Sequence, residues 1–311
     1  MQKLQIGPIN AATPTPLNSD GGFDRGSARR LCRRWIDLQL DGVLILGNMG
    51  EGGLVSDETR SSFIETALAE AGDKLTIFVS AADASLHRMR ERALAYASMG
   101  APCVVLCIAP GVAPQRAVDD VKRIADACPV PCAYYDAPSR TGTALMLNEI
   151  LSILAHPNIV AFKDSSASEV IAQGVTSRQY RPAGVSILDG VEYRTAFSAA
   201  LGYDGVLHGG GVLTACRVRA IWDLAKAGRF REALELDRQN ALFLATVYNR
   251  LSRPLQNTIG QKYVLQLLGV LDEPAVAVDQ SLDDNSRARI AQAVNEQRAW
   301  LLPAGAEATK V

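Results

Sequence analysis

Residues 132–163 read CAYYDAPSRTGTALMLNEILSILAHPNIVAFK and contain one complete unit of the pattern that organises this chain. The apolar run Cys132 to Asp136 is followed by a loop, by a segment with helical periodicity and by a second apolar run, Ile159 to Lys163. Short runs of β-branched and aromatic residues favour buried strands, and strands that alternate with helices favour a parallel sheet. The stretch therefore predicts two parallel strands joined by a helix.

The same unit recurs along most of the chain. From the second apolar run onward, successive runs mostly end roughly 30 residues apart, which is the length of one strand with its helix. The helices carry their own signals, such as Ser56 before the acidic pair Asp57 and Glu58, and Gly72 or Gly100 just past helical ends. The predicted strands are Ile6 to Ala12, Val43 to Leu46, Leu75 to Ala81, Cys103 to Ile108, Cys132 to Asp136, Ile159 to Lys163, Val185 to Asp189 and Gly205 to His208.

Eight such units predict an α/β fold, a (β/α)8 TIM barrel. An open doubly wound sheet would more often carry a glycine-rich dinucleotide-binding fingerprint after its first strand, and none is present there. After about Arg229 the pattern changes to helices without strands, in Phe230 to Leu251, Thr258 to Leu271 and Ser281 to Leu302. We predict a catalytic barrel over residues 1–228 and a C-terminal helical extension over residues 229–311 that packs on the barrel as an appendage.

The composition indicates a globular protein that acts on a small molecule. Apolar residues make up 48% and charged residues 21% of the 311 residues, so a large core can be buried. The 32 basic and 33 acidic residues are interspersed and nearly cancel, which argues against a nucleic-acid partner. The start MQKLQIGPIN lacks the apolar region of a secretory signal, and no later stretch approaches the roughly 20 apolar residues of a membrane span. We expect a cytoplasmic protein without a membrane partner.

The cysteine and histidine pattern predicts neither a disulfide scaffold nor a metal site. The six cysteines lie mostly in apolar segments, as reduced core thiols do. In the pairs Cys103/Cys107 and Cys128/Cys132, four residues of extended strand would separate the sulfurs by roughly 13 Å, too far to chelate one zinc ion. The three histidines have no ligand spacing between them. We expect no metal and no cofactor.

Lys163 stands where barrel enzymes place their chemistry, at the carboxyl end of a strand. It closes the run Ile159 to Phe162, which should bury its stem in an apolar wall. Desolvation disfavours an ammonium and so lowers the pKa of a buried lysine, and the neutral amine can attack a ketone. The alternative interpretation is a loop lysine paired with Asp164.

One unit earlier, YYDAPSRTG at Tyr134 to Gly142 ends the neighbouring strand. A phenol there, on Tyr135, can exchange protons with a carbinolamine as the imine forms. Arg140 follows on a loop, where its planar fork can receive a carboxylate. The alternatives are a core tyrosine with a satisfied hydroxyl and a solvated loop arginine.

Two glycine-rich turns follow the second and eighth predicted strands. The segment GNMGEGG, at 47–53, has small residues that let backbone amides approach an anion such as a carboxylate, although any tight turn also favours glycine. The segment HGGG, at 208–211, leads into a helix, and many barrels bind phosphate at this location. The imidazole of His208 can also act as an acid or base, or hydrogen-bond a substrate hydroxyl.

The segments LGNMGEGGLVSDETR, YYDAPSRTG and AFKDSS together resemble the dihydrodipicolinate synthase and N-acetylneuraminate lyase family, in order and in spacing. The opening AATPTPL is also similar to the first strand of that family, and the helical tail to its C-terminal extension. The resemblance implies that Lys163 forms a Schiff base, that Tyr135 shuttles protons and that Arg140 binds substrate. It further implies a carboxylate site at the backbone of Asn48 and Met49, no cofactor, and a homodimer or homotetramer.

The chain also departs from this family. The usual pair of hydroxyl residues before Gly-Glu is replaced by Asn48 and Met49, and the loop after the fourth strand reads APGV where the synthases carry a Tyr-Tyr pair. The departures make dihydrodipicolinate synthesis doubtful and favour a divergent lyase. In the sialic acid lyases, residues after strands six and seven bind sugar hydroxyls, which assigns similar roles here to Ser165, Gly190 and Glu192.

The leading hypothesis is a class I aldolase or lyase for pyruvate, or a related 2-oxo acid, and a small aldehyde. A dehydratase of a 2-keto-3-deoxy sugar acid would use the same imine, and the sequence does not separate the two. A barrel that binds a metabolite without catalysis and a phosphate-binding barrel enzyme are the other classes that the motifs leave open.

Overall fold

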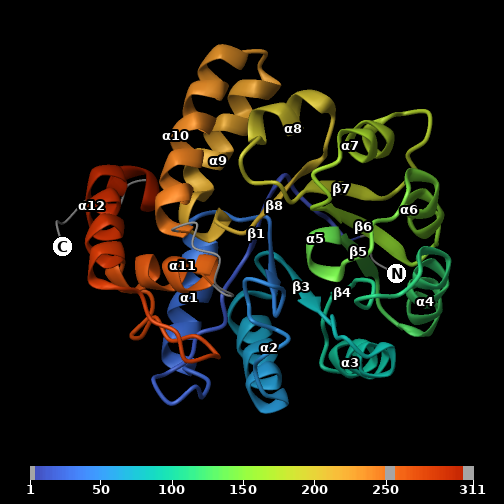
Figure 1. The fold of residues 1–311 in the computed structure, drawn as a ribbon, viewed down its shortest axis with the longest axis horizontal. Helices are drawn as coiled ribbons and strands as arrows, with labels where there is room; N and C mark the ends of the chain where they lie inside the picture. The colour runs from blue at the N-terminus through green and yellow to red at the C-terminus, as the bar shows by residue number, and fades with distance from the viewer. Residues whose placement is uncertain (1–3, 249–255, 304–311) are drawn as a thin grey trace.

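The computed structural model describes residues 4–248 and 256–303, with the side chain of residue 256 excepted, and Figure 1 shows their arrangement. All eight strands found in these residues are parallel and join in chain order into a closed barrel, in which β8 pairs with β1. The predicted (β/α)8 TIM barrel is confirmed. The strands are β1 (Ile9–Ala12), β2 (Gly42–Ile45), β3 (Thr76–Ser80), β4 (Cys103–Leu106), β5 (Cys132–Asp136), β6 (Ile159–Asp164), β7 (Ser186–Asp189) and β8 (Gly205–His208).

The predicted strands are found in place, and most differences lie at their ends. Strand β1 begins at Ile9 and not at Ile6, because Pro8 has no backbone N–H for a sheet ladder. Strand β4 ends at Leu106, two residues before the predicted end. Strand β6 runs one residue further than predicted, to Asp164.

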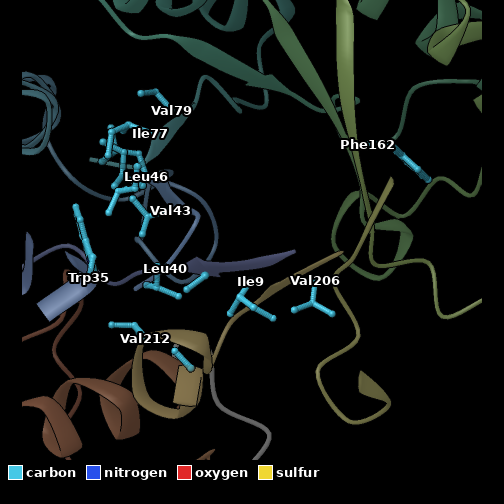
Figure 2. Close-up of a cluster of buried hydrophobic side chains, with 14 of the residues drawn as sticks. Ile9, Trp35, Leu40, Val43, Leu46, Ile77, Val79, Phe162, Val206 and Val212 are labelled. Atoms are coloured by element: carbon cyan, nitrogen blue, oxygen red, sulfur yellow. The ribbon is translucent and has the colours of Figure 1, made fainter. Parts of the chain in front are cut away.

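Two apolar layers hold the barrel. Inside it, side chains such as Leu44, Phe78 and Leu188 form a small cluster, because alternate residues of every strand point to the barrel axis. The intervening residues point outward and form the larger core against the helices. Figure 2 shows members of this outer layer, among them Val43 and Val206 of the strands. This alternation decides which strand-end side chains reach the mouth.

Helices surround the barrel in Figure 1, and many begin at a residue that caps them. The side chains of Asp24, Ser56, Ser85, Ser168 and Asp283 accept hydrogen bonds from backbone N–H groups in the first turn of their helices. The helices are α1 (Arg25–Asp37), α2 (Asp57–Ala71), α3 (Leu86–Ser98), α4 (Pro114–Ala127), α5 (Pro138–Thr141), α6 (Leu147–Leu154), α7 (Glu169–Thr176), α8 (Thr195–Leu201), α9 (Gly211–Lys226), α10 (Phe230–Tyr248), α11 (Gln256–Leu267) and α12 (Asp284–Leu301).

The last three helices lie against one side of the barrel. Helix α10 packs on α9, α11 on α10, and α12 on α9, α10 and α11. The buried guanidinium of Arg34 in α1 donates to the backbone oxygens of Val212 in α9 and Leu301 at the end of α12, which ties these two helices to α1. The domain boundary expected at residues 228 and 229 stays a prediction, and the predicted helix end at Leu251 lies outside the described residues.

A search of the described helices for segments of membrane-spanning length and hydropathy finds none.

Candidate active site

Lys163 lies inside the mouth of the barrel. It pairs in register with Tyr135 on β5 and with Leu188 on β7, whose side chain belongs to the inner cluster. Only 7% of Lys163 is exposed, and burial lowers the pKa of its ammonium to about 8, while the negative charge of Glu192 opposes this shift. A lysine with this pKa is neutral in an appreciable fraction of molecules near physiological pH.

The alternative interpretation, an ion pair between Lys163 and Asp164, does not occur. The carboxylate of Asp164 faces the outer layer, where it accepts hydrogen bonds from Ser166 and from the hydroxyl of Tyr203. Alternation along β6 separates the two neighbours, because consecutive side chains of a strand point to opposite faces. The amine is therefore left in the mouth.

Tyr135 lies directly beside the amine. The Nζ atom of Lys163 is 4.5 Å from the centre of the Tyr135 ring, and burial raises the pKa of the phenol. The Tyr135 hydroxyl is hydrogen-bonded to Ser165, and the amide Nδ2 of Asn48 donates to it at 3.3 Å. The Tyr135 hydroxyl therefore has a hydrogen-bond partner at position 48, although the hydroxyl pair of the family is absent.

The loop after β2, residues 47–53, requires glycine at positions 50 and 52. A Cβ at Gly50 would come within 2.7 Å of the backbone nitrogen of Leu46, and one at Gly52 within 1.7 Å of the Leu46 oxygen. Glu51 between them adopts the left-handed conformation at φ +55° and is buried. Its carboxylate forms an ion pair with the buried Lys262 of α11 and accepts a hydrogen bond from the backbone of Ala277. The C-terminal segment therefore holds this loop in place.

Glu192 lies in the loop after β7, on the β7 and β8 side of the mouth. One oxygen of its carboxylate accepts hydrogen bonds from the backbone N–H of Gly210 and, at 3.0 Å, from the hydroxyl of Tyr248 in α10. Burial raises its pKa, which these donors and the charge of Lys163 oppose. Because Glu192 already takes the Gly210 amide, the turn at 209–211 does not offer that donor to a phosphate. This contact argues against the phosphate-binding hypothesis.

Ser165 and Gly190 lie together beside Lys163. A Cβ on Gly190 would come within 2.1 Å of the Ser165 hydroxyl oxygen and 3.0 Å of Cε of Lys163, so no larger residue fits there without movement. Met49 is half-buried and contacts the inner cluster from the loop after β2. Arg140 is exposed on the short helix α5 and lowers the pKa of Tyr135 through its charge.

His208 is placed differently from the other candidates. It ends β8 and pairs in register with Ala11, which packs in the outer layer, so alternation directs the imidazole away from the barrel axis. Burial, together with the positive charges of Lys163 and Arg194, lowers its pKa to about 3. The ring is neutral near physiological pH. Its role in binding substrate stays a prediction, as do the roles of the other candidates.

Sequence reasoning missed a row of carboxylates at neighbouring strand ends. Asp136, Asp164 and Asp189 end β5, β6 and β7 and pair with one another in register. They point outward and bond to polar partners in the surrounding layer: Tyr134, Tyr203 and Arg194, respectively. The sequence does indicate this row, because each aspartate comes one position after a strand residue that points to the barrel axis.

The prediction about one cysteine pair is wrong. Cys128 follows α4, and the turn at 129–131 brings its thiol into hydrogen-bonding contact with that of Cys132 at the start of β5, so the intervening residues are not an extended strand. Within the described residues, no group of three or more histidine, cysteine, aspartate or glutamate side chains is arranged to hold a metal ion.

The chain is similar to known proteins over most of its length. The model of the dihydrodipicolinate synthetase family matches residues 5–296. A 4-hydroxy-tetrahydrodipicolinate synthase of Streptomyces coelicolor is 28% identical over 93% of both chains. A dihydrodipicolinate synthase of Bacillus anthracis has the same fold, with a TM-score of 0.86 at 17% identity over 93% of this chain and 98% of that one. The protein CdNal of Clostridium difficile, solved with mannosamine, gives 0.85 at 17% identity over 94% and 99%.

Proposed function

Because the chain belongs to the dihydrodipicolinate synthetase family, we propose that it is a lyase of the class I aldolase type, which binds pyruvate or a related 2-oxo acid as a Schiff base on Lys163. The observation that carries this proposal is the position of the Lys163 amine, which is buried, forms no ion pair with any described residue and lies 4.5 Å from the centre of the Tyr135 ring. A neutral amine beside a phenol is the pair of groups that imine chemistry needs.

The proposed reaction begins with attack of the Lys163 amine on the ketone carbon. Tyr135 donates a proton to the carbinolamine oxygen as water leaves, and its phenolate takes up a proton again in a later step. Its hydrogen bonds to Asn48 and Ser165 hold the phenol in place for both transfers. The resulting iminium accepts the electron pair when a carbon-carbon bond breaks beside it. In the direction of synthesis it loses a proton from C3, and the enamine so formed on Lys163 attacks an aldehyde.

The substrate carboxylate is proposed to bind at the loop after β2. Backbone amides near Asn48 and Met49 carry partial positive charge and lie in the segment that Glu51 and Lys262 hold in place. Arg140 supplies a positively charged side chain at the entrance. Ser165, Gly190 and Glu192 are proposed to contact the second substrate. The imidazole of His208 is directed away from the barrel axis, so no contact with the substrate is proposed for it.

A second candidate function is synthesis of 4-hydroxy-tetrahydrodipicolinate, for which the relative from Streptomyces coelicolor is named. The asparagine at position 48 and the sequence APGV after β4 argue against it, because they replace the hydroxyl pair of the family and the Tyr-Tyr pair of the synthases. A sugar-acid dehydratase would use the same imine to expel hydroxide. A barrel that only binds a metabolite is less well supported, since Asn48 restores a hydrogen bond to Tyr135.

Borohydride reduction tests the imine directly. The protein is incubated with saturating pyruvate and sodium borohydride, and its intact mass is measured. We expect the mass to increase by one reduced pyruvate, Lys163→Ala to abolish the increase, and the exposed control Lys74→Ala to retain it. An unchanged mass of the unmodified protein would overturn the proposal, and an adduct that persists in Lys163→Ala would show that another lysine reacts.

We also propose that the chain forms a homodimer or a homotetramer, as its family resemblance implies. Sedimentation velocity at micromolar concentration measures the assembly directly. A single species with the mass of one chain would contradict this proposal.

A further inference from the structure

Two thiols meet at the amino ends of the strands, on the side of the barrel opposite Lys163. Helix α4 ends at Ala127, and Cys128 follows it with an extended backbone. Strand β5 begins at Cys132, and the thiols of Cys128 and Cys132 are in hydrogen-bonding contact. The same strand carries Tyr135 at the mouth, so roughly 10 Å of strand separates the thiol pair from the proposed proton shuttle.

The turn between the two cysteines, residues 129–131, brings the sulfurs together. Four residues of extended strand would span roughly 13 Å, whereas a disulfide needs Cα atoms about 4.4–6.8 Å apart. The two prolines of the turn fix φ at their positions. The side-chain Nδ2 of Asn158 lies 2.9–3.0 Å from the backbone oxygens of Ala125, Cys128 and Val130. The turn is therefore held closed, and the two thiols stay side by side.

A third thiol, that of Cys103 on β4, is near this pair but on the other face of the sheet. Val104 pairs in register with Cys132, and both belong to the outer layer. Cys103 comes one position before Val104 and belongs to the inner cluster, because consecutive strand residues point to opposite faces. The sheet therefore separates Cys103 from Cys132, whereas the turn joins Cys132 to Cys128.

Cys128 is the thiol of the pair that is better suited to attack an oxidant. It is 6% exposed, and Cys132 is fully buried. The Cys132 thiol donates a hydrogen bond that lowers the pKa of Cys128, although burial opposes this shift. The pKa of each of the other five thiols is raised. Because the thiolate is the form that attacks, Cys128 is the nucleophile of the pair and Cys132 is the thiol that can resolve its oxidised form.

We propose that Cys128 and Cys132 form a reversible oxidation site, at which hydrogen peroxide converts the two thiols into a disulfide within one chain. The Cys128 sulfur attacks one oxygen of the peroxide, and the O–O bond breaks, which leaves a sulfenic acid on Cys128 and releases water. The Cys132 sulfur then attacks the Cys128 sulfur, the S–O bond breaks, and the hydroxide leaves with the thiol proton as a second water. The two thiols are oxidised and the peroxide is reduced.

The test counts free thiols before and after oxidation. The reduced protein is treated with a small molar excess of hydrogen peroxide, unfolded in guanidinium chloride with N-ethylmaleimide, and weighed intact. We expect two fewer than the six cysteines to carry the label, and dithiothreitol before labelling to restore all six. Labelling of all six cysteines after peroxide treatment would overturn the proposal.

Digestion with trypsin locates the disulfide. Cleavage after Arg123 and Arg140 gives the peptide 124–140, which contains Cys128 and Cys132 and no other cysteine. Without reductant, the unlabelled peptide should be lighter by about 2 Da than the reduced one, because disulfide formation removes two hydrogen atoms. A disulfide that links this peptide to another part of the chain would overturn the proposal.

Three variants separate the roles of the thiols. Cys128→Ser should leave the mass of peptide 124–140 unchanged by peroxide, since the attacking sulfur is gone. Cys132→Ser should stop the reaction without a disulfide and lead to a sulfinic acid on Cys128, a gain of about 32 Da. Cys103→Ser is the matched control and should still lose two labelled thiols. The same loss in Cys128→Ser or Cys132→Ser would show that other cysteines react.

The inference stands apart from the proposed function, because the thiols lie at the amino ends of the strands and Lys163 lies at the mouth. A protein that loses two labelled thiols but forms no pyruvate adduct would overturn the proposed function and support the oxidation site. A protein that forms the adduct but keeps all six thiols would do the reverse.

Discussion

Lys163 and Lys262 are both buried, but their surroundings differ. Burial lowers the pKa of both amines. Lys262 forms an ion pair with Glu51 and donates to the backbone oxygen of Ala275, whereas Lys163 has no carboxylate within ion-pairing distance among the described residues. The two amines therefore differ in pairing and not in burial. The Glu51 carboxylate opposes the loss of the Lys262 proton, whereas Lys163, the proposed nucleophile, has no such partner among the described residues.

The largest expected effect comes from removing the proposed nucleophile, the Lys163 amine. Lys163→Met should lower the aldol rate by roughly 10³-fold or more, because the covalent nucleophile is lost. Its free energy of unfolding should stay the same or rise, since an apolar chain of similar length replaces an unpaired buried amine. Steady-state kinetics and urea unfolding measure the two effects. A variant that keeps its activity would assign the chemistry to another residue.

Lys262→Met should lower the free energy of unfolding, in contrast to Lys163→Met. It leaves the Glu51 carboxylate buried without its partner, which costs about 3–5 kcal/mol of unfolding free energy. The double variant Glu51→Gln with Lys262→Met removes both charges and should recover part of this loss. Urea unfolding followed by circular dichroism is the measurement. Equal stability of Lys262→Met and the unmodified protein would show that the pair is not structural.

The pH dependence of imine formation should report the Lys163 amine. Only the neutral amine attacks the ketone, so the rate should rise with pH and level off above about 8, where the buried ammonium has lost its proton. Below this value the rate should fall about tenfold per pH unit. Rapid-mixing kinetics with pyruvate between pH 6 and 9 provide the profile.

Two variants sharpen that profile. Glu192→Gln removes the charge that raises the Lys163 pKa and should move the midpoint to lower pH, whereas Lys262→Met should leave it in place. A midpoint near 10, the ordinary range of lysine, would contradict the burial argument.

The smallest expected effect is at Asn48. Asn48→Ala removes a single hydrogen bond to the Tyr135 hydroxyl, worth about 1 kcal/mol, and should lower kcat about fivefold. Asn48→Thr places a hydroxyl at the same position and should restore part of the rate. If Asn48→Ala has full activity, the contact does not position the phenol.

Much of the fold was predictable because strand and helix periodicities repeat along the chain. The same regularity placed Lys163 and Tyr135 at neighbouring strand ends, since both close apolar runs one unit apart. Strand alternation, applied to every position, would also have separated the inward Lys163 from the outward Asp164 and His208. The spacing argument fails at Cys128 because prolines at 129 and 131 favour a turn, so the segment between the two cysteines is not extended.

The supporting contacts of the site were not predictable from local spacing. Tyr248 and Glu192 are 56 residues apart, and the backbone of Ala277 is 226 residues from Glu51. Neither pair falls within one strand and helix unit, so periodicity carries no information about them. The hydrogen bond from Asn48 to Tyr135 likewise depends on how two separate loops meet above the barrel.

The closure of the barrel has a consequence for the growing chain. Asn10 on β1 bonds to the backbone of Val206 on β8, across 196 residues. At about 5–20 residues per second, a ribosome needs roughly 10–40 s to make that interval, and throughout it the open edge of β1 has no neighbour on that side. Protection of β1 amides in nascent chains should therefore arise only after β8 has emerged, which pulse-labelled hydrogen exchange can follow.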